Sequence, residues 1–574
     1  MSFALINLII RKMQPRYNIK HIQFLCLIII IGTFACKPKG NFSSIKAQDV
    51  SIIPFSKEEK DFGKEISPFI QGLFDAVDTT KKLEIGNNIK IKSADFVKDI
   101  YAANGFKSLW FVDSGLNGRG LNLMEYYENS PKIGLNNSFY HIEKIKLWID
   151  SISTNLNGEE KNIKIAQTDI ALTNAFLQTT KHLHFGIIDY KYDVINYNFD
   201  SIQRIFVTEE VKHLVDKTPK EIFDESEPQI VHYQQLKSAL INFVAQNDIK
   251  PSDLRIRDFK KDSLGAMEDV RKALIFHKYL NSNIQITDSV NFLGAFKKFQ
   301  KDHNLKADAL PGENTIYALT VDNYDKFQSI ILSLDKWRSL NKTPWPKECI
   351  FVNIPSFELW YLKNDSLERK HNVVVGKTTN QTPEINSKLE NIVLLPSWSV
   401  PQSIIKKEMM GKIKAGTLRG YKVTRHKNGW IQVVQPPGKG NSLGVIKFNF
   451  KNDHSVYIHD TPSKSLFSND YRAYSHGCVR LKDPVDFGAF ILTKQQTDTT
   501  IITEDSLRKV INRGNSKIVP ITTDIQIYIR YITAMVDYQG KLNIYKDIYK
   551  KENDLIDRLF NNYDSSWIKS STNP

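Results

Sequence analysis

The hydrophobic pattern of this chain changes near residue 351, and that change constrains the fold more than any other feature. Upstream, apolar residues recur at helical spacing, as Phe96, Ile100 and Tyr101 do. Downstream, short runs rich in β-branched and aromatic residues, such as 372–376 and 444–450, are bounded by Gly, Pro and Asn, which is typical of strands. The pattern predicts a multidomain α+β protein in which helical domains precede a mainly β domain.

The length of 574 residues predicts three or four folded units. We predict this order along the chain: a signal peptide at 1–36, a tether at 37–60, a helical scaffold domain at 61–250, a small helical module at 251–322, a linking helix at 323–345, the β domain at 346–508, and an extension of strand and helix at 509–574. Within the β domain, the Lys-rich amphipathic stretch 403–427 is either a lid over one end of the sheet or a solvated excursion.

The N-terminus has the pattern of an export signal. Four basic residues between positions 11 and 20 precede an apolar stretch at 22–35, which is too short to span a membrane comfortably and is typical of a secretory signal. Its end, Ala35-Cys36, resembles the processing site of a bacterial lipoprotein, with ordinary signal-peptidase cleavage as the alternative. We expect Cys36 to carry a lipid that anchors the mature protein to a membrane. Because Lys37 rather than Asp follows Cys36, the expected location is the periplasmic face of the outer membrane.

The charge balance favours an anionic partner. Lys and Arg number 78 against 63 Asp and Glu, so the formal net charge is +15. The basic residues are mixed with acidic ones along the whole chain, and there is neither a zinc-finger spacing nor an aromatic, Gly-rich RNA-binding signature. We therefore expect an acidic polymer or lipid surface as the partner and no nucleic acid.

Four cysteines occur, at positions 26, 36, 349 and 478. The first two fall in the predicted signal, so the exported chain is not a disulfide scaffold. Cys478 has the surroundings of a nucleophile, because His476 and Arg480 flank it and Asp483-Pro484 predicts the start of a helix shortly after it. Both features favour the thiolate form.

A general base for this thiol is available on a nearby predicted strand. In 455–459, alternation places Ser455, Tyr457 and His459 on one face, so that His459 can face the thiol. Gly477 allows a sharp turn that brings the amides of Gly477 and Cys478 toward an attacked carbonyl. A thiol, a base and such donors are what acyl transfer requires.

Two other interpretations of these residues stay open at this point. Ser475 and His476 are expected to hold the loop by hydrogen bonds. Cys478 and the histidines could instead be ordinary buried core residues. Their grouping in the SHGC segment argues against that interpretation. A zinc site formed by His459, His476 and Cys478 lacks any CxxC or HxxxH spacing, so we expect no metal.

The segments VYIHDTP and RAYSHGCVRL, with 478 − 459 = 19 positions from His to Cys, closely resemble the signature of the L,D-transpeptidase family with a YkuD-type catalytic domain. Other segments, including NIVLLPSWSVPQSI, YITAMVDYQG and FVKDIYAANGFKSLWF, look like the large YcbB-like branch of that family. The likeness extends over nearly all of the mature chain. Module 251–322 resembles a peptidoglycan-binding module, with Asp308-Ala309 in place of the usual Asp-Gly.

The resemblance implies a role for each site residue. The implied nucleophile is Cys478 and the base His459; the oxyanion loop is Ser475, His476 and Gly477; the substrate contacts are Tyr457, Arg480 and Trp398. The implied reaction is attack of the thiol on the third residue, a diamino acid, of a peptidoglycan tetrapeptide stem, with release of the terminal D-Ala. Transfer of the acyl group to the amine of another stem then gives a 3→3 cross-link. No cofactor is implied, and carbapenem β-lactams are the implied inhibitors.

Other functions stay open on the sequence alone. One is a noncatalytic peptidoglycan-binding lipoprotein, and another is an L,D-carboxypeptidase or amidase-type cysteine hydrolase on the same fold. Exchange of free D-amino acids at the same thioester is a further outcome. The presence of both Cys478 and His459 argues against the noncatalytic protein, whereas the sequence does not say whether water or an amine reaches the thioester.

Overall fold

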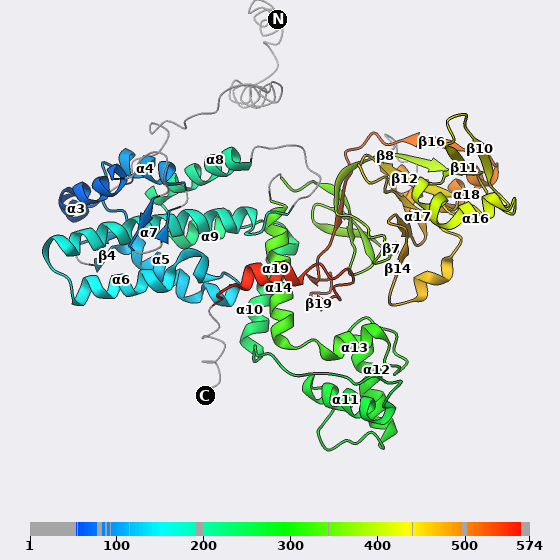
Figure 1. Ribbon diagram of the computed structural model, residues 1–574, viewed down its shortest axis with the longest axis horizontal. Helices are drawn as coiled ribbons and strands as arrows, with labels where there is room; N and C mark the ends of the chain where they lie inside the picture. The colour runs from blue at the N-terminus through cyan, green and yellow to red at the C-terminus, as the bar shows by residue number, and fades with distance from the viewer. Residues whose placement is uncertain are drawn as a thin grey trace, which may run out of the picture. The chain divides into compact units, whose positions relative to one another are not determined.

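The computed structural model describes residues 53–563 except 54, 77–82, 87–88, 92, 114, 191–198, 342–343, 439 and 496–501. The predicted signal peptide, with Cys36, and most of the predicted tether therefore lie outside the described residues. The described part combines helical domains with a large, mainly β domain, which confirms the α+β prediction (Figure 1). No helix in the described part is both long and apolar enough to cross a membrane.

A long buried helix organises the first domain (Figure 1). Helix α7 (Gly158–Phe185) contacts α3 (Lys57–Asp75), α6 (Ile142–Thr154) and α9 (Pro219–Ser226), and nearly all of its residues from 165 to 180 are buried. A helix that is buried on all sides is the expected centre of a helical domain. The other elements here are β1 (Glu84–Ile85), β2 (Ile89–Lys90), α4 (Ala94–Ala103), β3 (Phe111–Val112), β4 (Gly115–Leu116), α5 (Gly118–Asn129), η2 (Ser130–Ile133), η3 (Asn137–Tyr140), α8 (Phe199–Lys212), η4 (His213–Val215) and α10 (Val231–Gln246).

Three helices form a small module with its own apolar core: α11 (Ser263–Phe276), α12 (Ser289–Asp302) and α13 (Glu313–Thr320). Ala309, in the loop before α13, has a φ of 56°, in the left-handed region where Gly is the unstrained residue. The resembled module carries Gly at this position, and the backbone here keeps the conformation that Gly favours. Ala309 adopts it at a cost of about 1 kcal/mol.

Helix α14 (Asn323–Ser339) is tied to segments before and after it by buried polar groups. Asp335 accepts a hydrogen bond from the amide of Ile187, at 2.6 Å. Lys336 Nζ lies 2.6 Å from a carboxylate oxygen of Glu552, and both side chains are buried. Such buried pairs determine which segments meet, because removing one partner leaves an uncompensated charge.

The β domain contains a ten-stranded sheet in the order β12-β13-β15-β7-β6-β5-β17-β8-β16, with β14 paired to β7. A further pairing of β12 with β8 closes the path from β12 to β8 into a ring, so that each strand of the ring has a partner on both sides. The strands are β5 (Glu348–Asn353), β6 (Glu358–Lys363), β7 (Ser366–Gly376), β8 (Ile385–Leu394), β12 (Ile446–Phe450), β13 (Ile458–His459), β14 (Ala473–Ser475), β15 (Val479–Leu481), β16 (Lys517–Pro520) and β17 (Gln526–Arg530).

Helices α17 (Pro484–Thr493) and α18 (Glu504–Asn512) share one apolar core with this sheet. Contact is close at Gly488, where an added Cβ would come within 2.5 Å of a side-chain carbon of Ile446. A short hairpin, β18 (Ala534–Val536) and β19 (Leu542–Ile544), and helix α19 (Asn553–Phe560) follow the sheet in the chain.

Residues 398–435, named the cap here, fold around a separate apolar cluster that includes Ile405, Met409 and Val433. Strand β11 does not join the main sheet and pairs in a small sheet of order β10-β11-β9. The elements of the cap are β9 (Trp398–Ser399), α15 (Gln402–Ile404), the π-helical turn η5 (Ile405–Met409), α16 (Met410–Lys414), β10 (Lys422–Arg425) and β11 (Ile431–Gln435).

Candidate active site

The predicted site residues meet at one cavity of about 500 Å³ in the β domain. The cap contributes part of its lining, and the segments around β13 and between β14 and β15 contribute most of the rest. The predicted residues that line it are Cys478, His459, Ser475, His476, Tyr457, Arg480 and Trp398. Gly477 lies between two lining residues in the chain and shapes the loop rather than the surface.

The groups around the Cys478 thiol have opposing effects on its pKa. Burial raises its pKa, while hydrogen bonds from the amide and hydroxyl of Tyr457 and the nearby cations Lys447 and Arg480 act in the opposite direction. Sγ also lies 3.9 Å from the carbonyl oxygen of Ser455. Because the burial effect is the largest, the resting group is a neutral thiol.

The expectation that a helix start would favour the thiolate is wrong. Strand β15 lies between Cys478 and helix α17, so the thiol is not at the helix N-terminus. Asp483 precedes the helix with a φ of 52°, and its side chain does not cap it. The Pro484 start is as predicted, but the positive end of the helix does not act on the thiol.

The imidazole of His459 is buried, with 4% of its surface exposed. Burial, together with the charges of Arg480 and Lys447, lowers the pKa of His459 to about 3, so the ring is neutral at physiological pH. Nδ1 contacts the carbonyl oxygen of Asp460, which only accepts hydrogen bonds. Nδ1 therefore carries the proton, and Nε2 is left as the proton acceptor.

The strand that carries His459 is shorter than the sequence predicts. It is only Ile458–His459, because Ser455 has a φ of 55° and leaves the extended conformation. The faces are nevertheless as predicted, since the rings of Tyr457 and His459 lie 5.5 Å apart at their centroids, while Ile458 is buried in the sheet core. Among the described residues, no hydrogen bond joins the His459 ring to Sγ of Cys478.

The hydroxyl of Ser475 fixes the conformation of the loop that leads to Cys478. Ser475 Oγ donates to the carbonyl of Cys478 at 2.5 Å and accepts a hydrogen bond from the Gly477 amide at 3.1 Å. Gly477 has a φ of 118°, a conformation that residues with a side chain rarely adopt. Of the two amides that the sequence suggests for an oxyanion, that of Gly477 is thus used within the loop.

Thr382 and Tyr549, which were not predicted, hold this loop from outside. Thr382 is fully buried, and its hydroxyl donates to the carbonyl of Gly477 at 2.8 Å and accepts from the amide of Gly376 at 2.8 Å. The Tyr549 hydroxyl accepts from the Thr382 amide at 3.1 Å and donates to the carbonyl of Gly376 at 2.7 Å. These residues are far apart in the sequence, and no local pattern marks them.

Tyr457 links the thiol to the cap. Its hydroxyl is hydrogen bonded to the side chains of Cys478 and Trp398, and burial raises its pKa above the usual value. Lys447 Nζ lies 3.8 Å from the centre of the Tyr457 ring, at cation–π distance. Arg480 also lines the cavity, and its buried Nε has no hydrogen-bond partner in the described part of the chain.

A second contact with the cap was not predicted. Nε2 of His476 lies 2.7 Å from a carboxylate oxygen of Glu408, which belongs to η5. Both side chains line the same cavity as Cys478. A signal for Glu408 does exist in the sequence, because it is an acidic residue in a strongly basic segment.

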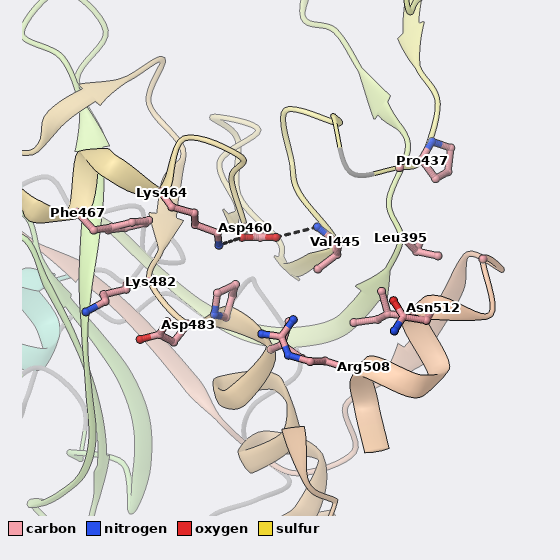
Figure 2. A pocket seen from close by; sticks show the side chains of 15 residues that line it. Leu395, Pro437, Val445, Asp460, Lys464, Phe467, Lys482, Asp483, Arg508 and Asn512 are labelled. Atoms are coloured by element: carbon pink, nitrogen blue, oxygen red, sulfur yellow. Dashed lines mark hydrogen bonds and ion pairs between the residues drawn. The ribbon is translucent and has the colours of Figure 1, made fainter. Parts of the chain in front are cut away.

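A larger cavity of about 730 Å³ lies beside Asp460 (Figure 2). The Asp460 carboxylate accepts a hydrogen bond from the Val445 amide at 2.9 Å and pairs with Lys464, which holds the residue after His459 in place. No cysteine or histidine occurs among the described residues that line this cavity, so it offers neither a thiol nor an imidazole. The smaller cavity is therefore the candidate active site.

No cluster of three His, Cys, Asp or Glu side chains within the described ranges has an arrangement suited to a metal ion. The other thiol, Cys349, is fully buried in strand β5, and burial raises its pKa far above the usual value. Cys478 is thus the described cysteine with access to a cavity.

Residues 347–502 match the family model of the L,D-transpeptidase catalytic domain named YkuD. These residues form a YkuD-type L,D-transpeptidase catalytic domain. The match contains every residue of the candidate active site discussed above except Tyr549. Residues 95–240 match the family model of a scaffold domain. The predicted family and the pairing of a helical scaffold with a mainly β catalytic domain are confirmed, while the YcbB-like branch stays a prediction.

One curated relative carries a name from the same family. A curated protein of Haemophilus influenzae that carries the provisional name L,D-transpeptidase is 27% identical over 270 residues, which is 42% of this chain and 53% of the relative. The chain thus matches about half the length of that relative. A solved L,D-transpeptidase structure from Mycobacterium smegmatis is 14% identical and covers 32% of this chain and 58% of its own, with a TM-score of 0.18. One from Stackebrandtia nassauensis is 13% identical and covers 49% of this chain and 95% of its own, also with a TM-score of 0.18. At these scores the assignment rests on the family models.

The state of the thiol predicts the pH dependence of its alkylation. Because burial raises the pKa of Cys478 above the ordinary 9.0, we expect the rate of alkylation by iodoacetamide to keep rising as the pH passes 9.0, with no plateau at neutral pH. Lys447→Met removes a cation that lowers this pKa, so it should move the profile to higher pH. Mass spectrometry of labelled peptides measures both rates, and Cys349→Ala is the control with an unchanged profile. A plateau near neutral pH would instead indicate a thiolate–imidazolium pair.

Proposed function

We propose that this protein is a peptidoglycan L,D-transpeptidase that forms 3→3 cross-links between stem peptides through a thioester on Cys478. The observation that carries the proposal is that Cys478 and the neutral, buried His459 line one cavity of an L,D-transpeptidase catalytic domain. Because the chain matches about half the length of its curated relative, the substrates and partners of the whole protein are part of this proposal.

The first half-reaction is acylation. The Cys478 thiol attacks the carbonyl of the third stem residue, and Nε2 of His459 accepts the thiol proton as the C–S bond forms. The C–N bond to the terminal D-Ala then breaks, and the same proton passes to the leaving amine. A buried imidazole with a lowered pKa gives up this proton readily, since its charged form is poorly solvated.

The second half-reaction is transfer to an amine. The side-chain amine of another stem attacks the thioester, the amide bond forms, and the Cys478 thiol is restored. The net charge of +15 is complementary to the carboxylates of stem peptides, and Arg480, with its unpaired Nε, is suited to bind one. Ser475, His476 and Gly477 are proposed to shape the oxyanion loop, and Tyr457 and Trp398 to contact substrate.

Two features support transfer over the alternatives. The cap lines the cavity beside the thiol, so it can limit access of water to the thioester. A noncatalytic wall-binding lipoprotein would not need a thiol and a base in one cavity. The cysteine hydrolase and D-amino-acid exchange are outcomes that the product analysis below separates from cross-linking. Module 251–322 is proposed to bind peptidoglycan, and its likeness to a peptidoglycan-binding module is the support for this.

Removing the nucleophile should abolish turnover. Cys478→Ala is expected to release no D-Ala from a disaccharide tetrapeptide, because the covalent route is gone, and to keep the fold. His459→Ala should lower acylation by a factor of about 10² or more, the usual contribution of a positioned general base. Mass spectrometry of the products measures both effects, with Cys349→Ala as the nearly silent control. Full cross-linking by Cys478→Ala would contradict the assignment.

Carbapenem binding tests the thiol independently of the natural substrate. We expect the intact mass of the protein to rise by one carbapenem, because opening of the β-lactam ring by Cys478 gives a stable thioester that retains the whole inhibitor. Cys349→Ala should form the same adduct, and Cys478→Ala should form none. An adduct located on Cys349 would refute the proposed site.

The proposed location is the periplasm, with a lipid on Cys36 holding the protein at the outer membrane. The basic n-region and the apolar stretch 22–35 that ends at Ala35-Cys36 support this. We expect Cys36→Ser to move the protein from the membrane fraction to the soluble fraction, with D-Ala release by the solubilised enzyme unchanged. A wild-type protein found wholly in the soluble fraction would remove the anchor and leave a soluble periplasmic enzyme.

A further inference from the structure

The cap carries a single carboxylate within a segment that is otherwise strongly basic. Glu408 is the single acidic residue in 403–427, a segment that contains eight basic residues: Lys406, Lys407, Lys412, Lys414, Arg419, Lys422, Arg425 and Lys427. It is also the one Asp or Glu among the described residues that line the catalytic cavity. The other ionisable groups there are histidines, tyrosines, the thiol and Arg480. Glu408 is thus the group in this cavity that can attract a cation.

The local structure fixes the position of Glu408. It belongs to the π-helical turn η5, between α15 and α16, and the buried Ile405 and Met409 anchor this turn in the apolar cluster of the cap. Turns of this type are rare and are frequently found at functional sites. The Glu408 side chain is 47% exposed, and its carboxylate lies 2.7 Å from Nε2 of His476, whose side chain is 34% exposed. The backbone is therefore held while the charged group remains accessible from the cavity.

The second half-reaction needs a cation-binding group and a second route for protons. The acceptor is an alkyl amine, which is an ammonium ion at neutral pH. It must lose one proton before it attacks the thioester. After attack, its nitrogen loses a second proton, which His459 can pass to the departing sulfur of Cys478. The first proton has to reach the solvent, and the side chain of His459 is only 4% exposed.

We propose that Glu408 and His476 form the acceptor-amine subsite of this catalytic domain. The carboxylate of Glu408 binds the incoming ammonium, and His476 accepts its first proton and passes it to water. The new C–N bond then forms as the C–S bond to Cys478 breaks, and each enzyme group returns to its starting state. This inference rests on the proposed transpeptidation and names the groups that recognise its second substrate.

The test separates donor and acceptor steps. The donor is a disaccharide tetrapeptide whose diamino-acid side-chain amine is acetylated, so that it cannot act as an acceptor. The acceptor is a stem tripeptide that ends at the diamino acid and cannot act as a donor because it lacks D-Ala. Glu408→Gln keeps the size of the side chain and removes its charge. We expect the KM for the acceptor to rise roughly tenfold to a hundredfold, the effect of losing a hydrogen bond to a charged group. The rate of D-Ala release in the absence of acceptor should fall by a smaller factor than the rate of cross-linking, so the ratio of cross-link to hydrolysis should fall.

A matched control removes the same charge elsewhere. Glu390 is exposed on strand β8 and does not line the cavity, so Glu390→Gln should leave the acceptor KM unchanged. An acceptor KM in Glu408→Gln equal to that of the wild type would overturn the subsite. A parallel loss of D-Ala release would also overturn it, because Glu408 would then act on the donor or on closure of the cap.

Failure of the proposed function has a different signature. If the wild type releases D-Ala but forms no cross-link with the tripeptide, the protein is a hydrolase, and both the transferase and its amine subsite are refuted. If the wild type forms no carbapenem adduct and releases no D-Ala, the cysteine chemistry itself is refuted. Failure of the subsite alone leaves D-Ala release and cross-linking by the wild type intact.

Discussion

The hydroxyl of Thr382 is the interaction on which the candidate active site depends. It donates to the carbonyl of Gly477 while it accepts from the amide of Gly376, so one buried side chain joins the loop before Cys478 to strand β7. The hydroxyl of Tyr549 in turn bonds to the backbone of Gly376 and of Thr382. Each buried group left without a partner would cost about 1–3 kcal/mol, so the network strongly favours a single loop conformation. Because Tyr549 lies beyond 347–502, the structural unit that supports the site extends past the matched domain.

Burial decides the electrostatics of the site. It raises the pKa of Cys478 and lowers that of His459, so the resting pair is a neutral thiol and a neutral imidazole. An ion pair would be better placed for attack, but its charges would lose solvation in this cavity. Transfer of the thiol proton during attack avoids that cost. The cations Lys447 and Arg480 then stabilise negative charge as it develops on sulfur, since both act to lower the thiol pKa.

The two histidines of the site differ in their exposure to solvent. His459 is nearly enclosed and is fixed by the carbonyl of Asp460, whose carboxylate is held in turn by the Val445 amide and Lys464. His476 is partly exposed and meets a carboxylate of the cap. A buried base suits a proton that stays within the reacting groups, whereas an exposed one suits a proton that leaves for water. This division follows from accessibility rather than from residue type.

The sequence by itself determined the family of the catalytic domain and the combination of a helical scaffold with a mainly β domain. The spacing of His459 and Cys478, the SHGC loop and the change from helical to strand periodicity are local patterns, and local patterns are what a single sequence records. The helix start at Pro484 was also predictable, but its effect on the thiol was not, because β15 places the two apart. Only the tertiary structure decided the protonation states, since these depend on burial. It alone brought Thr382, Tyr549 and Glu408 to the site, because closure of the sheet and folding of the cap join segments that no short-range pattern connects.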